Sequence, residues 1–418
     1  MTATSVPDAP VGDALAAPSP AVAPPPGNPR FPLFDSLRAI AVLAVVTFHV
    51  ASISGALNTR IVGDVLAVLG DVGLVLFFVI SGFLLYRPFV AARLSGRRQP
   101  STVRYARRRV LRIVPAYWAA LTVLAIFPGV VGPFSGDWWR YYFFGQLYSN
   151  RTVGSGIPVA WTLCVEVSFY VMLPLWAWAV RRIQLGSGAR GLLRSELAPL
   201  AVLVACGVAV QLAASRLAVS RLISDSLLGQ CTWFALGMAL AVASVAVPAR
   251  RSDGRLLRAA RDHPGLCWVG AAACLAGLAA VLQPGGAFTI LLALTTKQPV
   301  AKTLAGLALT AGLMVLLVAP AIFGGDQGGV PRRVLGAAPF ALLGLISYGV
   351  YLWHLPVLEF LGMHANRLQF SAHGLGLVGE IHHATTAILL VLTLAVTCAI
   401  AAVSYRFIEL PFLRRKEG

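Results

Sequence analysis

The sequence carries little charge. Of its 418 residues only 12% are charged, whereas a soluble domain usually carries about 25%. The polar side chains are too few to cover a soluble globule of this size, and the alternative solvent is lipid. In lipid every backbone polar group needs an internal partner, so only helices and closed barrels span the membrane.

The sequence also lacks the segments of about ten residues with alternating polarity that build a membrane barrel. It contains instead long, almost wholly apolar runs, such as residues 39–48 and 388–403. Such runs predict transmembrane helices. The expected fold class is an all-α integral membrane protein, a bundle of about ten transmembrane helices.

Paired cysteine motifs are missing as well. The six cysteines are Cys164, Cys206, Cys231, Cys267, Cys274 and Cys398. No CxxC spacing occurs among them, so neither a zinc site nor a disulfide framework is indicated. We interpret them as small apolar packing residues, and we expect no metal and no tightly bound cofactor.

Basic residues are abundant by contrast, and the formal net charge is +18. In a soluble protein this excess would suggest nucleic-acid binding. Here the arginines lie in short loops between apolar runs, so they are better explained as topology signals. We therefore expect a lipid bilayer as a partner and no nucleic acid.

Ten candidate spans follow from the apolar runs. They cover residues 34–55, 66–88, 110–132, 160–180, 197–217, 227–247, 265–283, 300–322, 335–362 and 384–406. With the N-terminus inside, 26 of the 34 Lys and Arg residues lie on the cytoplasmic side. This bias alternates loop by loop, which predicts that both termini are cytoplasmic.

Two segments outside the spans have their own composition. Residues 1–30 are rich in Ala and Pro and lack the basic start and long apolar core of a signal peptide. We expect them to form a disordered cytoplasmic tail that precedes a transmembrane domain at 31–418. The aromatic run at 138–144 predicts a short helix at the membrane interface.

Ionisable groups inside a span are costly and indicate function by default. Arg38 and His49 lie about three turns apart on the first span, so they share one face, roughly 16 Å apart along its axis. Arg38 is expected near the cytoplasmic leaflet and His49 in the outer half. A histidine whose hydrogen bonds are simply satisfied in the core is the alternative interpretation of His49.

Glu166 opens the fourth span and His354 lies on the ninth, both at the expected depth of His49. A carboxylate stabilised by the helix dipole is the alternative for Glu166. For His354 the alternative is a hydrogen-bonding stripe between helices, since Ser347, Tyr351 and His354 share one face. A histidine with a nearby carboxylate is the usual equipment for taking a proton from a hydroxyl.

The cytoplasmic start of the third span carries Arg108, Arg109 and Arg112. Arg109 and Arg112 lie one turn apart, and two such arginines can hold a phosphate. Ordinary topology anchors are the alternative. Ser81 and Gly82 lie in the inner half of the second span, where the glycine permits close approach to the backbone.

Six motifs in order resemble the acyltransferase-3 family of bacterial membrane O-acyltransferases, over roughly residues 31–415. They are Phe34-Asp35-Ser36-Leu37-Arg38 with His49, Phe77-Phe78-Val79-Ile80-Ser81-Gly82-Phe83, Arg108-Arg109-Val110-Leu111-Arg112-Ile113-Val114-Pro115, Trp161-Thr162-Leu163-Cys164-Val165-Glu166, Ser347 to Pro356, and Ser404-Tyr405-Arg406-Phe407-Ile408-Glu409.

The resemblance implies transfer of an acyl group, often acetyl, from acyl-CoA to a sugar hydroxyl. Implied acceptors are surface glycans such as O-antigen, exopolysaccharide and peptidoglycan, and macrolide antibiotics. The family's arginine and histidine on the first span match Arg38 and His49, its arginine pair matches Arg109 and Arg112, and its glutamate matches Glu166.

The chain departs from the family pattern at three positions. Val75 stands where an aspartate is common before the twin phenylalanines, Cys164 replaces a common serine, and Leu410 replaces a common arginine. No hydrolase-like domain follows the tenth span in this sequence, so we expect the short form of the family.

We therefore predict a multi-pass protein of the bacterial inner membrane, with acyl-CoA as donor and a carbohydrate-containing acceptor. The expected catalytic residues are His49, as general base, and Glu166, which tunes or orients it. The expected binding residues are Arg38, Ser81, Arg108, Arg109, Arg112, Trp161, Tyr351 and His354. A transporter or flippase of a lipid or glycoconjugate, and a lipid-binding scaffold without turnover, are the alternatives.

Overall fold

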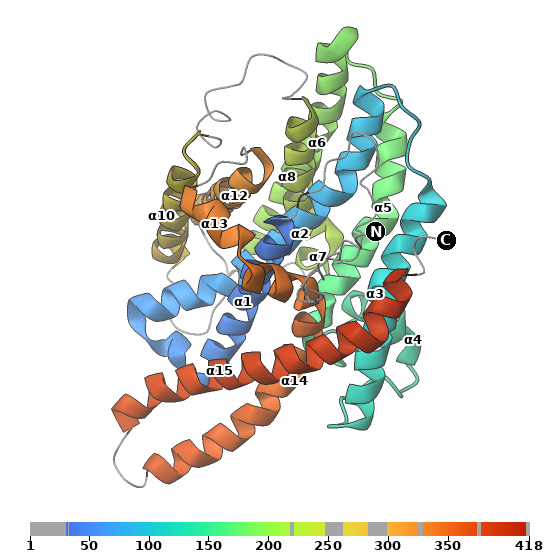
Figure 1. Ribbon diagram of the computed structural model, residues 1–418. Coiled ribbons are helices and arrows are strands. Elements are labelled where there is room, and N and C mark those ends of the chain that lie inside the picture. Colours follow the sequence, from blue (N-terminus) through green and yellow to red (C-terminus); the bar gives the residue numbers. More distant parts are fainter. Residues whose placement is uncertain are drawn as a thin grey trace, which may run out of the picture. The chain divides into compact units, whose positions relative to one another are not determined.

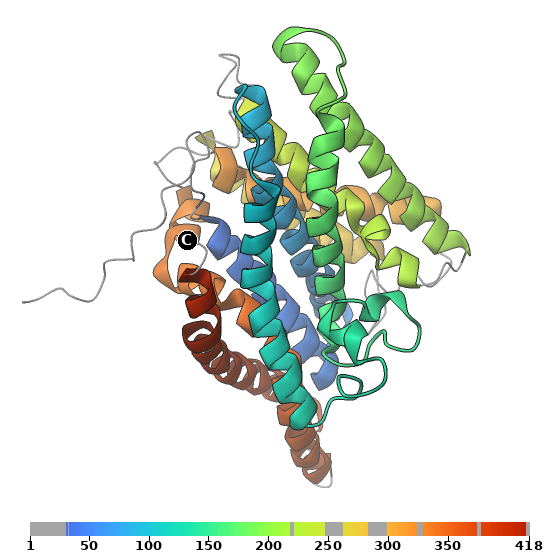
Figure 2. The same ribbon diagram turned by 90° about the vertical axis from the view of Figure 1, so that its right-hand side faces the viewer.

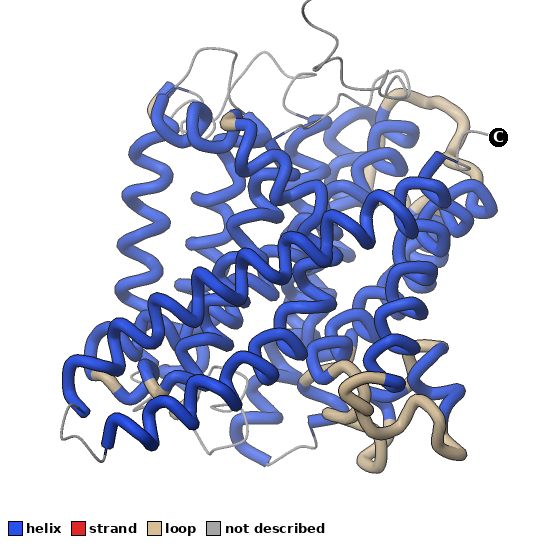
Figure 3. The backbone as a smooth tube through the Cα atoms, turned by 60° about the horizontal axis from the view of Figure 1, so that its bottom comes forward, coloured by secondary structure: helices blue, strands red, loops and turns tan. Residues whose placement is uncertain are grey.

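The computed structural model describes residues 31, 33–217, 221–246, 262–282, 299–323, 329–373 and 378–414. The predicted tail at 1–30 lies outside these described residues. Within them every regular element is a helix, and no strand occurs (Figure 3). The side chains of residues 363–384 are likewise outside the description.

Ten helices are long and apolar enough to cross a membrane, which confirms the predicted fold class. They are α1 (Leu33–Ser54), α2 (Arg60–Leu94), α3 (Thr102–Ile126), α5 (Trp161–Val180), α6 (Gly188–Leu217), α8 (Leu227–Ala246), α10 (Pro264–Leu282), α12 (Val300–Phe323), α14 (Ala338–His373) and α15 (Val378–Ser404) (Figure 1). The cytoplasmic placement of the termini remains a prediction.

Shorter elements connect or extend these helices. They are η1 (Ala56–Asn58), α4 (Trp138–Tyr142), η2 (Gln146–Tyr148), η3 (Pro158–Ala160), α7 (Arg221–Ser224), α13 (Gly329–Gly336), the π-helix η4 (Tyr405–Glu409) and α16 (Leu410–Arg414). The aromatic run at 138–144 thus contains the short helix that its composition predicted, α4.

Glycines set the closest helix contacts, as expected where lipid provides no hydrophobic drive for helix association. A Cβ on Gly73 of α2 would lie 2.6 Å from the carbonyl oxygen of Ala41 on α1. Gly82 of α2 and Gly237 of α8 each face a backbone carbonyl of the other helix. These contacts bring α2 against both α1 and α8 and fix its rotation.

Helices α14 and α15, orange and red in Figure 1, run side by side. A Cβ on Gly349 of α14 would lie 2.9 Å from the Cβ of Ala401 on α15. The other side of α14 packs on α1. Helices α3 and α5 also run beside each other, as the view in Figure 2 shows.

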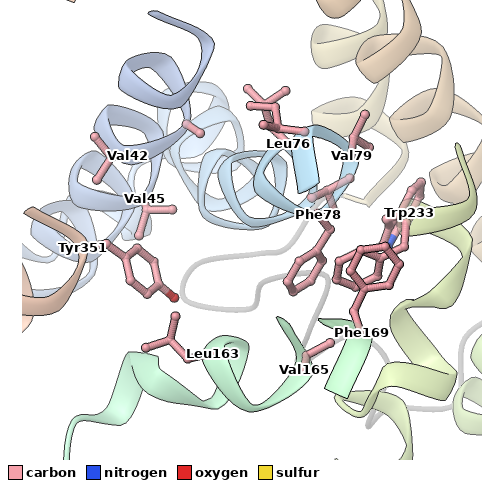
Figure 4. Close-up of a cluster of buried hydrophobic side chains, with 14 of the residues drawn as sticks. Val42, Val45, Leu76, Phe78, Val79, Leu163, Val165, Phe169, Trp233 and Tyr351 are labelled. Carbon is pink, nitrogen blue, oxygen red and sulfur yellow. The ribbon is translucent and has the colours of Figure 1, made fainter. Parts of the chain in front are cut away.

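Apolar side chains from α1, α2, α5, α8 and α14 meet in a common core (Figure 4). Phe169 of α5 stacks on Phe234 of α8 with ring centroids 4.1 Å apart, and Phe78 of α2 lies 4.8 Å from the same ring. Tyr351 enters this core from α14 and carries one of its few polar atoms. The polar groups described next therefore lie among close-packed apolar side chains.

We call the end of the bundle at which α1 begins and α2 ends the basic end, because the exposed Arg97, Arg98 and Arg104 lie there. The opposite end, with α4 and the long connection between α3 and α5, is called the far end. Helices α2 and α6 extend further than the apolar runs predicted. The additional turns carry arginines. These turns stay helical while the charged groups of the arginines reach toward water.

Candidate active site

Two histidines meet where α1 packs on α14. Nε2 of His354 lies 3.3 Å from Nδ1 of His49, and the ring centroids are 5.0 Å apart. His354 is fully buried, whereas His49 is half-buried. The structure thus gives His354 a histidine as neighbour; its predicted contact with substrate remains a prediction.

Each histidine also approaches a carbonyl of its own helix. Nδ1 of His49 lies 2.9 Å from the carbonyl oxygen of Val45, and Nδ1 of His354 lies 2.8 Å from that of Tyr351. Nε2 of His49 has no hydrogen-bond partner in the described part of the chain and is not among its enclosed unpaired atoms. One nitrogen of the pair therefore stays reachable, as a general base requires.

Glu166 lies in a different part of the predicted site from the two histidines. Its Oε1 accepts a hydrogen bond of 2.7 Å from the hydroxyl of Ser81 and one of 2.5 Å from the hydroxyl of Tyr170. Among the described residues it has no hydrogen bond to His49. Glu166 also interacts electrostatically with Arg109. The role of Glu166 in orienting His49 remains a prediction.

Three arginines gather near the basic end, and we call Arg38, Arg109 and Arg112 the arginine group. Nη1 of Arg38 lies 2.6 Å from Oδ1 of Asp35, and Arg38 interacts electrostatically with both other arginines. In the described part of the chain neither Arg109 nor Arg112 has a carboxylate within ion-pair distance. The guanidinium of Arg109 lies 5.8 Å from the ring centre of Tyr170.

Two enclosed polar atoms beside this group have no hydrogen-bond partner among the described residues. They are Nε of Arg109 and the hydroxyl of Tyr105, one turn earlier on α3. An unpaired enclosed donor costs about 1–3 kcal/mol, so such atoms usually find a ligand or a water. The arrangement suits an anion with several acceptor oxygens.

Tyr351 lies between the two histidines and Glu166. Its hydroxyl donates to the carbonyl oxygen of Val159 at 2.9 Å and lies 2.7 Å from the hydroxyl of Thr162. It also interacts electrostatically with Glu166. Polar groups therefore follow one another from the arginine group past Glu166 to the histidine pair, inside an otherwise apolar core.

Two predicted binding residues take less part in this arrangement. Arg108 is half-buried and is absent from the electrostatic neighbours of Arg38. Trp161 is partly buried against the core at the start of α5. No described contact joins either residue to the histidine pair or to Glu166, and their predicted roles remain predictions.

The sequence interpretation missed Tyr170, Tyr105 and Asp35. Tyr170 lies four residues after Glu166, and Asp35 lies three residues before Arg38. Both spacings place side chains on one helix face, so the signal was present. It passed unnoticed because tyrosine and a terminal aspartate are unremarkable at a membrane interface.

No group of three or more His, Cys, Asp or Glu residues suited to a metal occurs within the described ranges. All six cysteines are free. The imidazole of His49 is suited to proton transfer, and the arginine group is suited to electrostatic binding.

The model of the acyltransferase domain of the acyltransferase-3 family matches residues 32–405. The peptidoglycan O-acetyltransferase OatA of Listeria monocytogenes is 25% identical over 158 residues, 34% of this chain and 23% of that protein. The O-acetyltransferase OatA of Staphylococcus aureus is 25% identical over 164 residues, 35% of this chain and 25% of that protein.

The acyltransferase MdmB of Streptomyces mycarofaciens is 27% identical over 177 residues, 38% of this chain and 42% of that protein. The aligned part thus spans about a quarter of the length of the two OatA proteins and less than half of MdmB. No solved structure matches the chain.

Proposed function

Because the chain belongs to the acyltransferase-3 family, we propose that this multi-pass membrane protein transfers an acyl group, often acetyl, from acyl-CoA to a hydroxyl of a sugar-containing acceptor. A surface glycan, a glycolipid and a glycosylated natural product such as a macrolide are the acceptor classes considered. One observation carries the proposal: His49, with its reachable Nε2, lies on the same helix as Arg38, which interacts electrostatically with Arg109 and Arg112 of α3.

The arginine group is the proposed site for the phosphates of the donor. Phosphate oxygens accept hydrogen bonds from guanidinium groups, and Nε of Arg109 is an enclosed donor without a partner in the described part of the chain. We place the basic end in the cytoplasm of a bacterial plasma membrane, where acyl-CoA is available. An extended pantetheine arm is comparable in length to the rise of roughly 16 Å between Arg38 and His49.

The proposed reaction is a direct transfer. Nε2 of His49 takes the proton of the acceptor hydroxyl while the oxygen of that hydroxyl attacks the thioester carbonyl carbon. The carbon–sulfur bond then breaks, and the CoA thiolate receives the proton from His49. The products are the acylated acceptor and free CoA, and holding both reactants in place supplies part of the acceleration.

Glu166 fits the donor side of this proposal. It accepts hydrogen bonds from Ser81 and Tyr170 and lies in electrostatic range of Arg109. A carboxylate there limits repulsion among the arginines and holds the ring of Tyr170 beside Arg109. This role is an alternative to the one expected from the sequence, in which Glu166 orients His49.

The test is release of CoA thiol by purified protein in lipid nanodiscs, supplied with acetyl-CoA and a panel of glycans and glycosylated macrolides. We expect thiol release that depends on the acceptor, with equal acylated product by mass spectrometry. A transporter, flippase or lipid-binding scaffold would release none. A burst of thiol before acceptor is added would instead indicate an acyl-enzyme.

The matched variants are His49→Ala and His263→Ala. His263 is exposed beside the start of α10 and takes no part in the site. We expect His263→Ala to keep full activity. Full acyl transfer by a folded His49→Ala protein would end the proposal.

A further inference from the structure

We propose that His354 is a positioning residue that, together with the carbonyl of Val45, holds His49 in a single tautomer, with its proton on Nδ1 and its lone pair on Nε2. The catalytic consequence rests on the function proposed above. The tautomer itself is a property of the resting protein and is measurable without any substrate.

The contacts of His354 fix the position of its own proton. Its Nδ1 lies 2.8 Å from the carbonyl oxygen of Tyr351 and 3.2 Å from that of Val350. A carbonyl oxygen only accepts hydrogen bonds, so Nδ1 carries the proton. A neutral imidazole has one N–H, and Nε2 of His354 is therefore an acceptor.

Because Nε2 of His354 is an acceptor, it favours a proton on the nitrogen of His49 that faces it. Nδ1 of His49 faces two acceptors, Nε2 of His354 at 3.3 Å and the carbonyl oxygen of Val45 at 2.9 Å. A proton on Nδ1 satisfies both in a three-centre hydrogen bond. With the proton on Nε2 instead, the Nδ1 lone pair would face two other lone pairs, so that tautomer is disfavoured.

The fixed tautomer decides which nitrogen of His49 can act as the base. Nε2 of His49 keeps its lone pair and is the nitrogen that stays reachable. When it takes the hydroxyl proton, His49 becomes an imidazolium whose Nδ1–H still donates to His354. The added proton leaves again from Nε2 to the CoA thiolate, and His354 keeps its own proton throughout.

The surroundings of His354 favour positioning over proton transfer. The residue has no exposed surface, and its own N–H is held by carbonyls of α14. One turn earlier, Tyr351 ties α14 to Val159 and Thr162 at the start of α5. The acceptor that faces His49 is therefore fixed by backbone contacts and, among the described residues, has no second partner to which it can pass a proton.

The direct test is nitrogen NMR of the protein with ¹⁵N-labelled histidine, without substrate. Loss of signals in a His49→Gln variant identifies the two ring nitrogens of His49, and their couplings to the ring carbon protons distinguish Nδ1 from Nε2. We expect a protonated Nδ1 and an unprotonated Nε2 in the unchanged protein. A His49 protonated on Nε2 would overturn the proposal whatever the enzyme does.

The variants are His354→Gln, which offers an amide oxygen near the position of Nε2, and His354→Phe, which offers no acceptor. In His354→Phe only the carbonyl oxygen of Val45 still holds the Nδ1 proton of His49. We therefore expect a detectable share of the Nε2-protonated tautomer and a kcat lowered by about two- to tenfold, equivalent to the loss of about one hydrogen bond. The KM for acyl-CoA should stay near that of the unchanged protein. His354→Gln should restore the single tautomer and most of kcat.

His263→Phe is the matched control, because His263 is an exposed histidine away from the site. Unchanged kcat and an unchanged tautomer in folded His354→Phe would refute the positioning role. If His354→Phe does not fold, the spectra of the unchanged protein and of His354→Gln still decide the tautomer. A correct tautomer in a protein that releases no CoA would refute the proposed function alone.

Discussion

Two polar groups of opposite character lie near the two ends of helix α1, the arginine group at its start and the histidine pair toward its end. At the histidine pair, described contacts within the protein satisfy every ring nitrogen except Nε2 of His49. In the arginine group the charges are only partly paired, and Nε of Arg109 lacks a hydrogen-bond partner in the described part of the chain. The first region is organised by contacts within the protein, whereas for the second we propose that a bound anion completes the pairing.

This difference assigns separate kinetic signatures to the two regions. A group that acts only on the reacting atoms changes kcat, whereas a group that binds the donor equally before and during reaction changes KM. Substitutions at the histidine pair should therefore act on kcat and substitutions in the arginine group on KM.

Replacement of His49 by Ala should cause the largest loss. We expect kcat to fall by about 100- to 10,000-fold, the usual contribution of a general base. The KM for acyl-CoA should change little, because the arginine group is untouched. Initial rates of thiol release at varied acyl-CoA give both parameters, and a rise in KM with an unchanged kcat would contradict the division.

Replacement of Arg109 by Gln should change the KM for acyl-CoA and leave kcat nearly unchanged. A hydrogen bond to a charged group contributes about 1.5–3 kcal/mol, so we expect the KM for acyl-CoA to rise about 10- to 100-fold. The control is Arg104→Gln, an exposed arginine about one turn earlier on α3, which should leave KM unchanged. Equal effects of the two substitutions would indicate that the arginine group serves as a topology signal and does not bind the donor.

Replacement of Glu166 by Gln decides which region this residue serves. Its described hydrogen bonds go to Ser81 and Tyr170, so we expect a change of about three- to tenfold in the KM for acyl-CoA, equivalent to about one hydrogen bond. A fall in kcat alone would instead support the sequence-based prediction that Glu166 orients His49. Tyr170→Phe should reproduce part of the KM effect, since it removes one of the same hydrogen bonds.

The fold was predictable because membrane spans follow from length and apolarity alone. All ten spans are present, but the boundaries of α2, α3, α6 and α14 differ from the predicted ones. In α2, α3 and α6 the additional turns carry arginines, because helices continue past the hydrocarbon where arginines reach water. Residues 1–30 lie outside the described residues and leave the predicted tail untested.

The site was less predictable because depth follows from sequence but rotation does not. Helix direction placed His49, Glu166 and His354 at one depth, and the structure joins the two histidines. Glu166 turns instead toward Ser81 and Tyr170. Which way a helix faces depends on contacts such as those of Gly73 and Gly82, whose partners lie on other helices and leave no pattern in the local sequence.

Replacement of Tyr351 by Phe should have the smallest effect, because Tyr351 lies between the two regions and its hydroxyl is already paired with Val159 and Thr162. If this hydroxyl only ties α14 to α5, its loss should lower the free energy of unfolding by about 0.5–1.5 kcal/mol. The rate should fall less than about threefold, because loss of this hydrogen bond destabilises the folded protein more than it destabilises the transition state of the reaction. Thermal unfolding in nanodiscs and acceptor kinetics measure the two effects. A several-fold rise in the acceptor KM with unchanged stability would instead support the sequence-based prediction that Tyr351 contacts substrate, and would extend the histidine region to include it.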